Sequence, residues 1–374
     1  MTKFYTNVSR YANSLLYRGY ENGKRVSKRV KYKPTLYVST TKPTDWKALD
    51  GTPVAPIQMD SMRDAKEWIA ENKHTAGRTI FGNDKHVTCF INDEFPGKID
   101  FDRNVINVTT IDIEVASDDG FPEPEAAEQP VISITTKNNI DNTYYVWGMQ
   151  DYDVDNSYMQ SHRVVYKQFD TEAQLLMDFI EFWFSNTHSP DVITGWNVKF
   201  FDIPYLVNRS LKILGDDQTK KFSPWGLVDR RDVTRMGRTQ CSYELKGIAI
   251  VDYLELFQKF GYSYGPQESY RLDHIAHVVL GEKKLSYEEH GSLHSLYLND
   301  FQKFIDYNIK DVELVDRMED KMGLITLCMT IAYKGGVNYS DTFGTTAIWE
   351  SIIYRHLYES NVTIPFYEEK FKSP

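Results

Sequence analysis

The chain has 374 residues and a formal net charge of −10, from 43 Lys and Arg against 53 Asp and Glu. Its length exceeds the roughly 100 to 200 residues of a typical domain, so at least two compact units are expected. The acidic balance argues against a protein that coats nucleic acid through bulk positive charge. No apolar run reaches the roughly 18 residues of a membrane span, no secretory signal pattern is visible, and the 3 cysteines are widely scattered. A soluble protein of the reducing cytoplasm, without membrane contact, is predicted.

Residues 1–107 show the pattern of short strands joined by turns, with a hairpin turn at Asn22-Gly23. One helix interrupts these strands and is predicted to begin at Ser61, whose side chain can cap the first turn. Six basic residues and no acidic one occupy residues 23–33. This run could contact phosphates or form a solvated strand face, and the sequence leaves both interpretations open.

The pattern changes at Val108 to apolar strand runs interleaved with amphipathic helices, which is typical of an α/β domain. A helix is expected to begin after Thr171, its cap, and another to run from about residue 299 to 318. A further boundary lies near Gly335, beyond which residues 341–358 are predicted to be helical. The sequence therefore predicts a β-rich first region followed by an α/β region.

The first candidate for chemistry is a pair of acidic residues, Asp112 and Glu114, within the apolar run at residues 108–115. Side chains alternate along a strand, so both carboxylates point to one face and the neighbouring isoleucines to the other. Paired carboxylates in an apolar strand are costly unless cations compensate, and divalent ions such as Mg²⁺ accept carboxylate ligands. The alternative is an edge strand with two solvated acids.

A second group follows the predicted strand at residues 191–195. Ligand sites of α/β proteins commonly lie at the carboxyl ends of strands. Trp196 and Asn197 could stack on a nucleotide and hydrogen-bond it, with Phe201 and Asp202 a few residues further on. The alternative places Trp196 and Phe201 in the core and makes Asp202 a helix cap.

The third group consists of Tyr307 and Asp311, four residues apart on the helix predicted at residues 299–318. Residues at this spacing share a helix face. A phenol beside a carboxylate is suited to positioning a water molecule at a metal ion. The spacing is a weak signal by itself, because Tyr-x-x-x-Asp also occurs at Tyr166.

Together the three groups have the order and spacing of the three exonuclease motifs of the DEDD exonucleases, tyrosine subtype, which they resemble. Other segments resemble the proofreading region of B-family DNA polymerases of T-even-type tailed bacteriophages, namely residues 193–197, 201–205, 221–224, 251–256 and 306–315. The resemblance covers nearly the whole chain.

The resemblance implies a ribonuclease-H-like exonuclease domain, a mixed sheet flanked by helices, at residues 108–336. It implies a smaller β-rich α+β N-terminal domain at residues 1–107, completed by residues 337–374. The family's palm, fingers and thumb would begin about where this chain ends, and no palm motif is found in it. The chain alone is therefore expected to shorten DNA and not to extend it.

The implied activity is two-metal-ion 3′-to-5′ exonucleolytic cleavage of single-stranded or mismatched DNA ends, as in proofreading by a phage replicative DNA polymerase. Two Mg²⁺ or Mn²⁺ ions are expected in each site. By the family's pattern Asp112 would bridge both ions, and Glu114 and Asp311 would complete the ligand set of the ion that activates the attacking water. Asp202 would support the second ion, and Tyr307 would orient the attacking water.

Five residues are implied in DNA binding by the same resemblance: Phe121, Trp196, Asn197, Phe201 and Arg238. Phe121 and Trp196 match positions where the family stacks on the frayed 3′ end. Arg238 lies at the tip of a segment that resembles a β-hairpin which helps to part primer from template.

The expected partners are a single-stranded DNA 3′ end and a primer-template. A separate chain carrying the polymerase part and a sliding-clamp complex are further candidates, as is RNA bound through the N-terminal domain, and the expected location is the host cell cytoplasm. Two alternative functions stay open: a stand-alone exoribonuclease of the same fold and a non-catalytic nucleic-acid-binding module. All five catalytic motif residues are present, which favours the DNA exonuclease.

Overall fold

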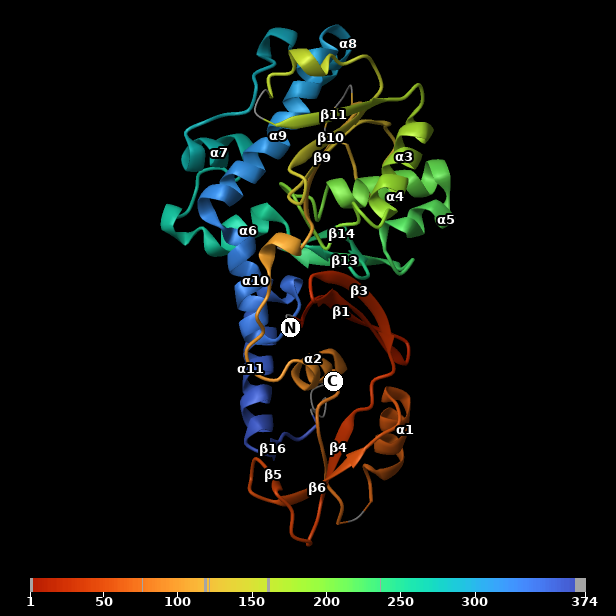
Figure 1. Cartoon of the computed structure of the whole chain (residues 1–374), viewed down its shortest axis with the longest axis vertical. Helices are drawn as coiled ribbons and strands as arrows, with labels where there is room; N and C mark the ends of the chain where they lie inside the picture. Colours follow the sequence, from red (N-terminus) through yellow and green to blue (C-terminus); the bar gives the residue numbers. More distant parts are fainter. Residues whose placement is uncertain are drawn as a thin grey trace. The chain divides into compact units, whose positions relative to one another are not determined.

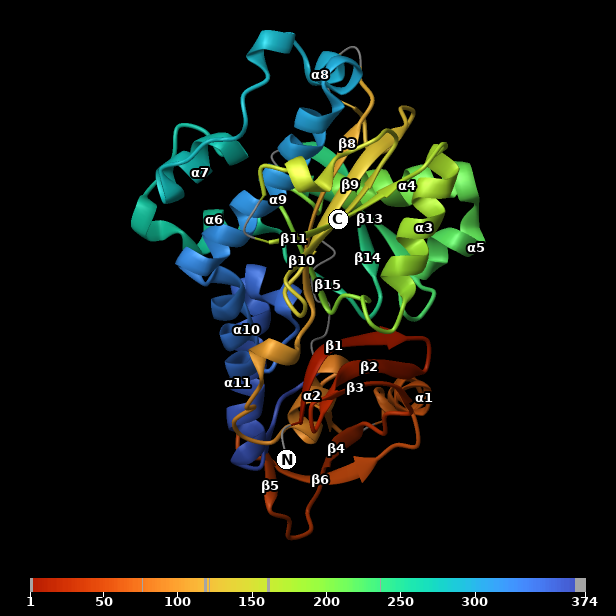
Figure 2. The ribbon, with the colours of Figure 1, turned by 45° about the horizontal axis from the view of Figure 1, so that its top comes forward.

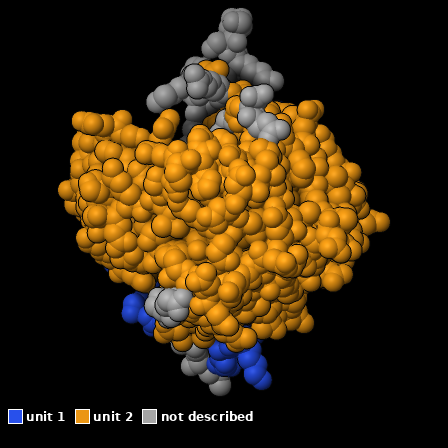
Figure 3. All heavy atoms as spheres, turned by 90° about the horizontal axis from the view of Figure 1, so that it is seen from above, with its two compact units in different colours: residues 1–101, 330–374 blue, residues 102–329 orange. Residues whose placement is uncertain are grey.

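The computed structural model describes residues 3–75, 77–117, 120, 122–159, 162–235 and 237–366, without the side chains of Arg235 and Arg238. The chain divides into two compact units. Unit 1 comprises Met1–Phe101 and Thr330–Pro374, and unit 2 comprises Asp102–Met329. Figure 3 shows the surface of unit 2 from one side in orange.

Unit 1 is rich in short strands, which form two sheets in its described part (Figure 1). The first is antiparallel and contains β1 (Lys3–Tyr11), β2 (Ser14–Glu21) and β3 (Lys24–Val30). The second has the order β16 (Val362–Thr363), β5 (Trp46–Ala48), β6 (Pro53–Gln58), β4 (Thr35–Ser39) and β7 (Ile80–Phe81). Its helices are α1 (Met62–Asn72), α2 (His86–Glu94) and α11 (Thr345–Glu359), while α10 (Leu324–Gly335) contains the boundary between the units.

Local signals determine the first helix and the β2–β3 hairpin, as predicted. The Ser61 side chain caps α1 by accepting a hydrogen bond from the Asp64 backbone N–H at 3.2 Å. Asn22 and Gly23 connect β2 to β3 with φ values of 53° and 76°, the left-handed conformation that a two-residue hairpin turn requires. β16 then pairs in parallel with β5, so the C-terminal segment adds a strand to the second sheet.

Unit 2 is built on a six-stranded mixed sheet. Its order is β11 (Arg163–Gln168), β10 (Thr143–Gly148), β9 (Val131–Asn138), β8 (Val108–Val115), β12 (Val192–Thr194) and β15 (Ala249–Ile250). β8, β9 and β10 pair antiparallel, and the remaining pairs are parallel. A separate hairpin contains β13 (Val228–Arg235) and β14 (Arg238–Leu245).

The helices of unit 2 are α3 (Glu172–Phe184), α4 (Asp202–Leu214), α5 (Asp216–Thr219), α6 (Tyr253–Phe260), α7 (Leu272–Leu280), α8 (Leu293–Asn299) and α9 (Phe301–Met322). Short 3₁₀ turns lie at Arg103–Val105, Val154–Asn156, Lys220–Phe222, Tyr262–Tyr264, Glu288–His290 and, in unit 1, Tyr339–Phe343. This mixed sheet flanked by helices, together with the β-rich unit 1, confirms the predicted α/β fold class. No helix in the described part of the chain combines the length and the apolar character needed to cross a membrane.

Helices cover both faces of the large sheet, and Figures 1 and 2 show α3 and α4 on the side opposite to α9. On the α3 and α4 side the core includes Ile111 and Ile113 of β8 packed with Phe179 of α3. On the α9 side, Phe304 and Ile305 pack against strands β9 and β10. β8 therefore presents its isoleucines to one layer of helices and its acids to the other.

The boundaries of two predicted helices differ from those in the structure by a few residues. The helix predicted from residue 299 begins at Phe301, because the Asp300 side chain caps it by accepting from the Lys303 backbone N–H at 3.0 Å. It continues to Met322 and ends at Gly323, whose φ of 63° suits a helix C-cap. The helix predicted from residue 341 begins at Thr345, because a capping box at Asn338 starts a separate 3₁₀ turn first.

Candidate active site

The centre of the candidate site is the α9-facing side of β8. Asp112 and Glu114 point to this side, and Glu114 is only 9% exposed. In the ladder with β9, Asp112 lies opposite Thr135 and Glu114 lies opposite Ser133. The apolar run thus forms a central strand of the sheet rather than the solvated edge strand that was the alternative.

A third carboxylate, Asp202, reaches this strand from the first turn of α4. It is 3% exposed, and its Oδ1 accepts a hydrogen bond from the Ile113 backbone N–H at 3.0 Å. β12 runs parallel to β8, so the loop that leads to α4 leaves the sheet at the same end as the acids. At Gly195 in this loop a Cβ would lie 2.4 Å from the Ile111 carbonyl oxygen, so this close approach of loop to strand requires glycine.

Helix α9 contributes Tyr307 and Asp311, which are 7% and 3% exposed. Asp112, Glu114 and Asp311 each offer a ligand atom, and these atoms all lie within 4.8 Å of one another. The Asp311 Oδ1 is buried and has no hydrogen-bond partner among the residues that the structure describes. A buried carboxylate oxygen without a donor is unfavourable unless a cation binds it, so the donor set fits a hard divalent ion.

Electrostatics at the site point to the same conclusion. Burial raises the pKa of Glu114 to about 8, with the nearby Asp311 adding to the effect. Burial likewise raises the pKa of Asp202 to about 7, although the Ile113 N–H opposes it. The pKa of Asp112 is raised well above its usual range by burial and then by its acidic neighbours. Like charges at this separation favour protonation unless a cation neutralises them.

The sequence did not identify Lys284, which the structure places in the same group. Its Nζ donates to the Tyr307 hydroxyl at 3.1 Å and forms an ion pair with Asp311. Its backbone N–H donates to the Asp273 carboxylate at 2.8 Å, which holds the segment after α7 in place. Burial disfavours the charged ammonium, but Asp311, followed by Tyr307, outweighs burial and raises the pKa of Lys284.

A cleft of about 1030 Å³ opens onto these groups. Trp196, Asn197 and Phe201 line it together with the carboxylates and Tyr307. The Trp196 indole N–H donates to the Tyr270 carbonyl oxygen at 3.1 Å, which fixes the orientation of its ring. The three predicted residues are therefore in place to contact a ligand bound at the acids.

The other two residues of the predicted DNA-binding set are less informative. Phe121 lies outside the described residues. Arg238 is the first residue of β14, next to the turn of the β13–β14 hairpin. Its side chain is not among those that the structure describes. Their roles stay predictions.

Asp252 organises the loop that carries Trp196 and Asn197. Its carboxylate accepts from the backbone N–H groups of Asn197 at 3.3 Å and Lys199 at 2.9 Å. The same side chain caps α6 through the Leu254 N–H at 2.9 Å. Asn197 adopts a φ of 68°, which asparagine tolerates better than most residues. Asp252 therefore shapes the wall of the cleft from behind.

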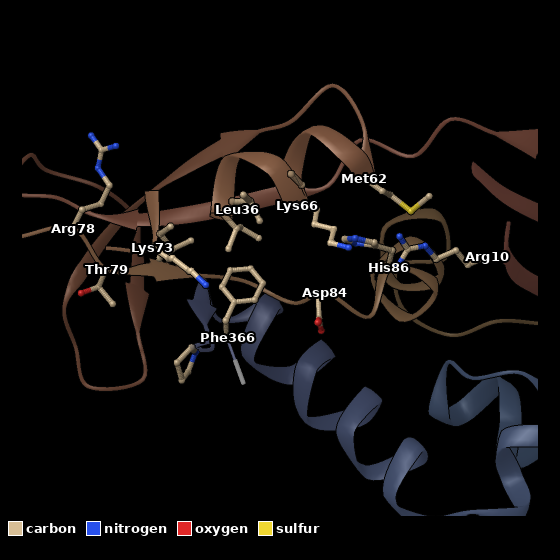
Figure 4. A pocket seen from close by; sticks show the side chains of 14 residues that line it. Arg10, Leu36, Met62, Lys66, Lys73, Arg78, Thr79, Asp84, His86 and Phe366 are labelled. Atoms are coloured by element: carbon tan, nitrogen blue, oxygen red, sulfur yellow. The ribbon is translucent and has the colours of Figure 1, made fainter. Parts of the chain in front are cut away.

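A second cavity, of about 940 Å³, lies within unit 1 (Figure 4). Figure 4 shows the side chains of Lys66, Lys73 and Phe366 directed toward the hollow, with the Asp84 carboxylate near its lower edge. Its lining includes four residues with permanent positive charge, Arg10, Lys66, Lys73 and Arg78. Asp84 is the single acidic residue among the described lining residues, so in the described part of the chain this cavity shows no carboxylate cluster like that of unit 2.

Comparison with known proteins yields a family match and several relatives. The exonuclease domain of DNA polymerase family B matches residues 67–275, which include Asp112, Glu114 and Asp202. The DNA-directed DNA polymerase of Escherichia phage RB69 is 32% identical over 98% of this chain and 42% of its own length. That of Enterobacteria phage T4 is 30% identical, with the same coverage of both chains. The DNA polymerase delta catalytic subunit of Dictyostelium discoideum is 30% identical over 71% of this chain and 25% of its own. The chain thus spans about two fifths of the length of the two phage relatives.

Proposed function

The chain belongs to DNA polymerase family B through its exonuclease domain, and we propose that it removes nucleotides from single-stranded or mismatched DNA 3′ ends as a proofreading 3′-to-5′ exonuclease. The observation that carries this proposal is the buried acidic group of Asp112, Glu114 and Asp311, with the ligand atoms within 4.8 Å of one another. Asp202 adds a fourth carboxylate at the same end of the sheet. The phage relatives named above are DNA polymerases, which supports DNA as the substrate.

In this proposal the four carboxylates would hold two Mg²⁺ or Mn²⁺ ions. When bound, such ions activate a water molecule and stabilise negative charge on the phosphate. Hydrolysis then forms a bond between the water oxygen and phosphorus and breaks the phosphorus bond to the 3′ oxygen. The products are a 5′-nucleoside monophosphate and a strand that is shorter by one residue with a free 3′ hydroxyl.

Tyr307 and Lys284 act on this reaction through the hydrogen bonds described above. The Lys284 ammonium donates to the Tyr307 phenolic oxygen and so fixes the direction of the hydroxyl, whose O–H is left to hold the attacking water. Burial raises the pKa of Tyr307 above its usual range, so the hydroxyl keeps its proton and can donate. Lys284 also offsets part of the negative charge of Asp311.

Substrate selection follows from the shape of the cleft. Trp196, Asn197 and Phe201 line it beside the acids, where an unpaired base could stack and form hydrogen bonds. A paired end must first be unstacked and unpaired, which costs a few kcal/mol, so frayed ends are preferred. Phe121 and the hairpin at Arg238 are proposed to complete the path of the strand.

The domain assignment is also a proposal: an exonuclease domain at residues 108–336 and an N-terminal domain at residues 1–107 completed by residues 337–374. We further propose that the exonuclease works with a polymerase part, on the same or a separate chain, and with a sliding clamp in the host cytoplasm. RNA binding through the N-terminal domain is a separate proposal, supported by the basic strand β3, whose residues 24–30 contain four Lys or Arg.

The test uses 5′-labelled oligonucleotides incubated with the purified chain in Mg²⁺ or in chelator. We expect a ladder of shortened DNA products in Mg²⁺ and none in chelator. A primer with mismatched 3′ bases should be shortened at least about tenfold faster than a fully paired one, because pairing energy opposes extraction. Equal rates on both ends would contradict the proofreading assignment. Preferential cleavage of an RNA of the same sequence would favour the exoribonuclease, and metal-independent binding without cleavage would favour the binding module.

A further inference from the structure

One residue next to the carboxylates lies within the Tyr-x-x-x-Asp motif, at a position to which that motif assigns no role. Asn308 lies on α9 between Tyr307 and Asp311 and is fully buried, with 0% exposure. Its side-chain Nδ2 donates a hydrogen bond to the Asp112 Oδ2 at 2.7 Å. Its Oδ1 accepts from two hydroxyls of β9, Ser133 Oγ at 2.9 Å and Thr135 Oγ1 at 2.5 Å.

The register of the sheet explains why these groups meet. Thr135 lies directly opposite Asp112, and Ser133 lies opposite Glu114, so the two hydroxyls and the two acids share one face. α9 packs across this face and places Asn308 over both strands. Both hydroxyl residues have 0% exposure, so water does not compete for their hydrogen bonds.

The Asp112 carboxylate, which only accepts, and the two hydroxyls, which can donate, together determine which way the amide of Asn308 points. A side-chain amide has one acceptor oxygen and one donor nitrogen. With both hydroxyls donating to Oδ1, the NH₂ group is directed at Asp112. The reverse orientation would place the amide oxygen against a carboxylate and leave buried groups without partners, which is unfavourable.

Fixing one oxygen of Asp112 has a consequence for the other. A free aspartate side chain can rotate about two bonds, and the neighbouring acids would repel it from the position in which all of them converge. With Oδ2 held by Asn308, Oδ1 is left to a ligand in the cleft. Residues that orient metal ligands in this way typically change metal affinity or activity by about 10- to 100-fold when they are removed.

We propose that Asn308 is a positioning residue that transmits the geometry of the Ser133 and Thr135 hydroxyls to Asp112 and thereby sets the affinity of the site for divalent cations. This inference rests on the proposed exonuclease function and adds to it a group of three residues that act through Asp112. Asn308 does not itself contact the ions or the substrate. A purely structural Asn308 would affect unfolding but not the metal affinity of the folded chain.

The chain offers a set of matched variants. Asn308→Leu keeps the approximate size of the side chain and removes its polar atoms, and the double variant Ser133→Ala with Thr135→Val keeps Asn308 but removes the groups that orient it. Thr136→Val is the control, because Thr136 lies on the same strand, is 1% exposed, and has a buried hydroxyl with no hydrogen-bond partner in the described structure.

The measurement is calorimetric titration of Mn²⁺ into the full chain without DNA, at a temperature where circular dichroism shows each variant to be folded. We expect Asn308→Leu to weaken Mn²⁺ binding about 10- to 100-fold. The Ser133→Ala, Thr135→Val pair should weaken it by a smaller factor, about 3- to 10-fold, and Thr136→Val should change it less than about 2-fold. If Asn308→Leu fails to fold, the hydroxyl pair alone still tests the proposal.

Combining the Asn308 variant with the hydroxyl variants tests whether the two hydroxyls act on Asp112 through Asn308. If the hydroxyls act only through the amide, adding Ser133→Ala and Thr135→Val to Asn308→Leu should weaken Mn²⁺ binding no further. Additive effects, or an Asn308→Leu chain that melts earlier but binds Mn²⁺ within 2-fold of the wild type, would overturn the proposal. Because this titration needs no substrate, it separates a wrong role for Asn308 from a wrong exonuclease assignment. In the second case Mn²⁺ binding would respond as stated although no DNA is cleaved.

Discussion

Two large cavities in the described part of the protein are similar in volume, about 940 Å³ in unit 1 and about 1030 Å³ in unit 2, but their described lining residues are opposite in charge. The unit 2 cleft is lined by six acidic residues, Asp112, Glu114, Asp202, Asp273, Glu288 and Asp311, against three basic residues, Arg271, Lys283 and Lys284. The lining residues described for the unit 1 cavity include four Lys or Arg and one acid. Cavity size therefore does not distinguish the candidate active site from the other hollow.

The two cavities differ in how deeply their charged side chains are buried. The cations of the unit 1 cavity, including Lys66 and Lys73, are exposed, so water solvates their charge at little cost. The unit 2 acids Asp202 and Asp311 are 3% exposed. A group of buried like charges is unfavourable in the absence of a counterion, and such groups cluster at functional sites. The difference between the two cavities can be tested by removing charges from each.

The largest effect is expected from removing an acid. Asp112→Ala or Asp311→Ala should lower the single-turnover rate of DNA shortening by about 10³-fold or more, because each change removes a ligand of the ions that activate water. Circular dichroism and binding of single-stranded DNA in chelator serve as controls, and both should stay near the wild-type values. Near-normal cleavage by either variant would show that the acids of unit 2 do not hold the catalytic ions.

A smaller loss is expected from Tyr307→Phe, which keeps the ring and removes only the hydroxyl. Loss of one positioned hydrogen bond should lower the single-turnover rate by on the order of 10- to 10³-fold. The Mn²⁺ affinity should change little, because the carboxylates stay in place. If the metal affinity fell as far as the rate, Tyr307 would support the ligands rather than the attacking water.

The sequence identified those parts of the site that a local pattern encodes. The alternation around Asp112 and Glu114 predicted one acidic and one apolar strand face, which the packing of Ile111 and Ile113 matches. Motif order then added Asp202 and the pair on α9, and the capping side chains at Ser61 and Thr171 predicted the starts of two helices correctly.

The groups that the sequence missed depend on distant partners. Lys284 is 27 residues from Asp311, in a segment with no motif spacing to it. Asn308 is 175 residues from Ser133 and 196 from Asp112, so only the pairing of β8 with β9 under α9 brings them together. The start of α9 at Phe301 lies close to the expected position near residue 299, and the small shift arises because Asn299 is the last residue of α8 and Asp300 is the cap of α9.

The acids should also make stability depend on pH when no metal is bound. Burial raises the pKa of Glu114 to about 8 and that of Asp202 to about 7, above the values of roughly 4 expected in the unfolded chain. The folded state therefore holds more protons between about pH 4 and pH 8, so this contribution to stability is fully present below about pH 4, declines as the pH rises and is lost above about 8.

In chelator we expect the melting temperature to fall by on the order of several degrees between pH 6 and pH 9. Added Mg²⁺ should raise it most at pH 9, where the carboxylates are ionised. A double variant, Glu114→Gln with Asp202→Asn, should show a flatter dependence. A melting temperature that rises with pH over this range in the wild-type chain would contradict the proposed sign.

The smallest effect is expected from a change to the unit 1 cavity, and one substitution made in both units gives a matched comparison. Lys66→Met and Lys284→Met remove the same charge and keep a long apolar side chain. Lys66 is exposed, whereas the Lys284 ammonium contacts both Tyr307 and Asp311. Cleavage of single-stranded DNA at saturating protein should therefore change less than about 2-fold in Lys66→Met, because solvent and salt screen a surface charge. The rate of cleavage should fall about 10- to 100-fold in Lys284→Met, because loss of the ammonium removes the hydrogen bond that orients the Tyr307 hydroxyl and the ion pair of Asp311. Equal effects of the two substitutions would mean that Lys284 acts only through the overall charge of the chain. The difference in burial between the charged residues of the two cavities would then not explain where catalysis takes place.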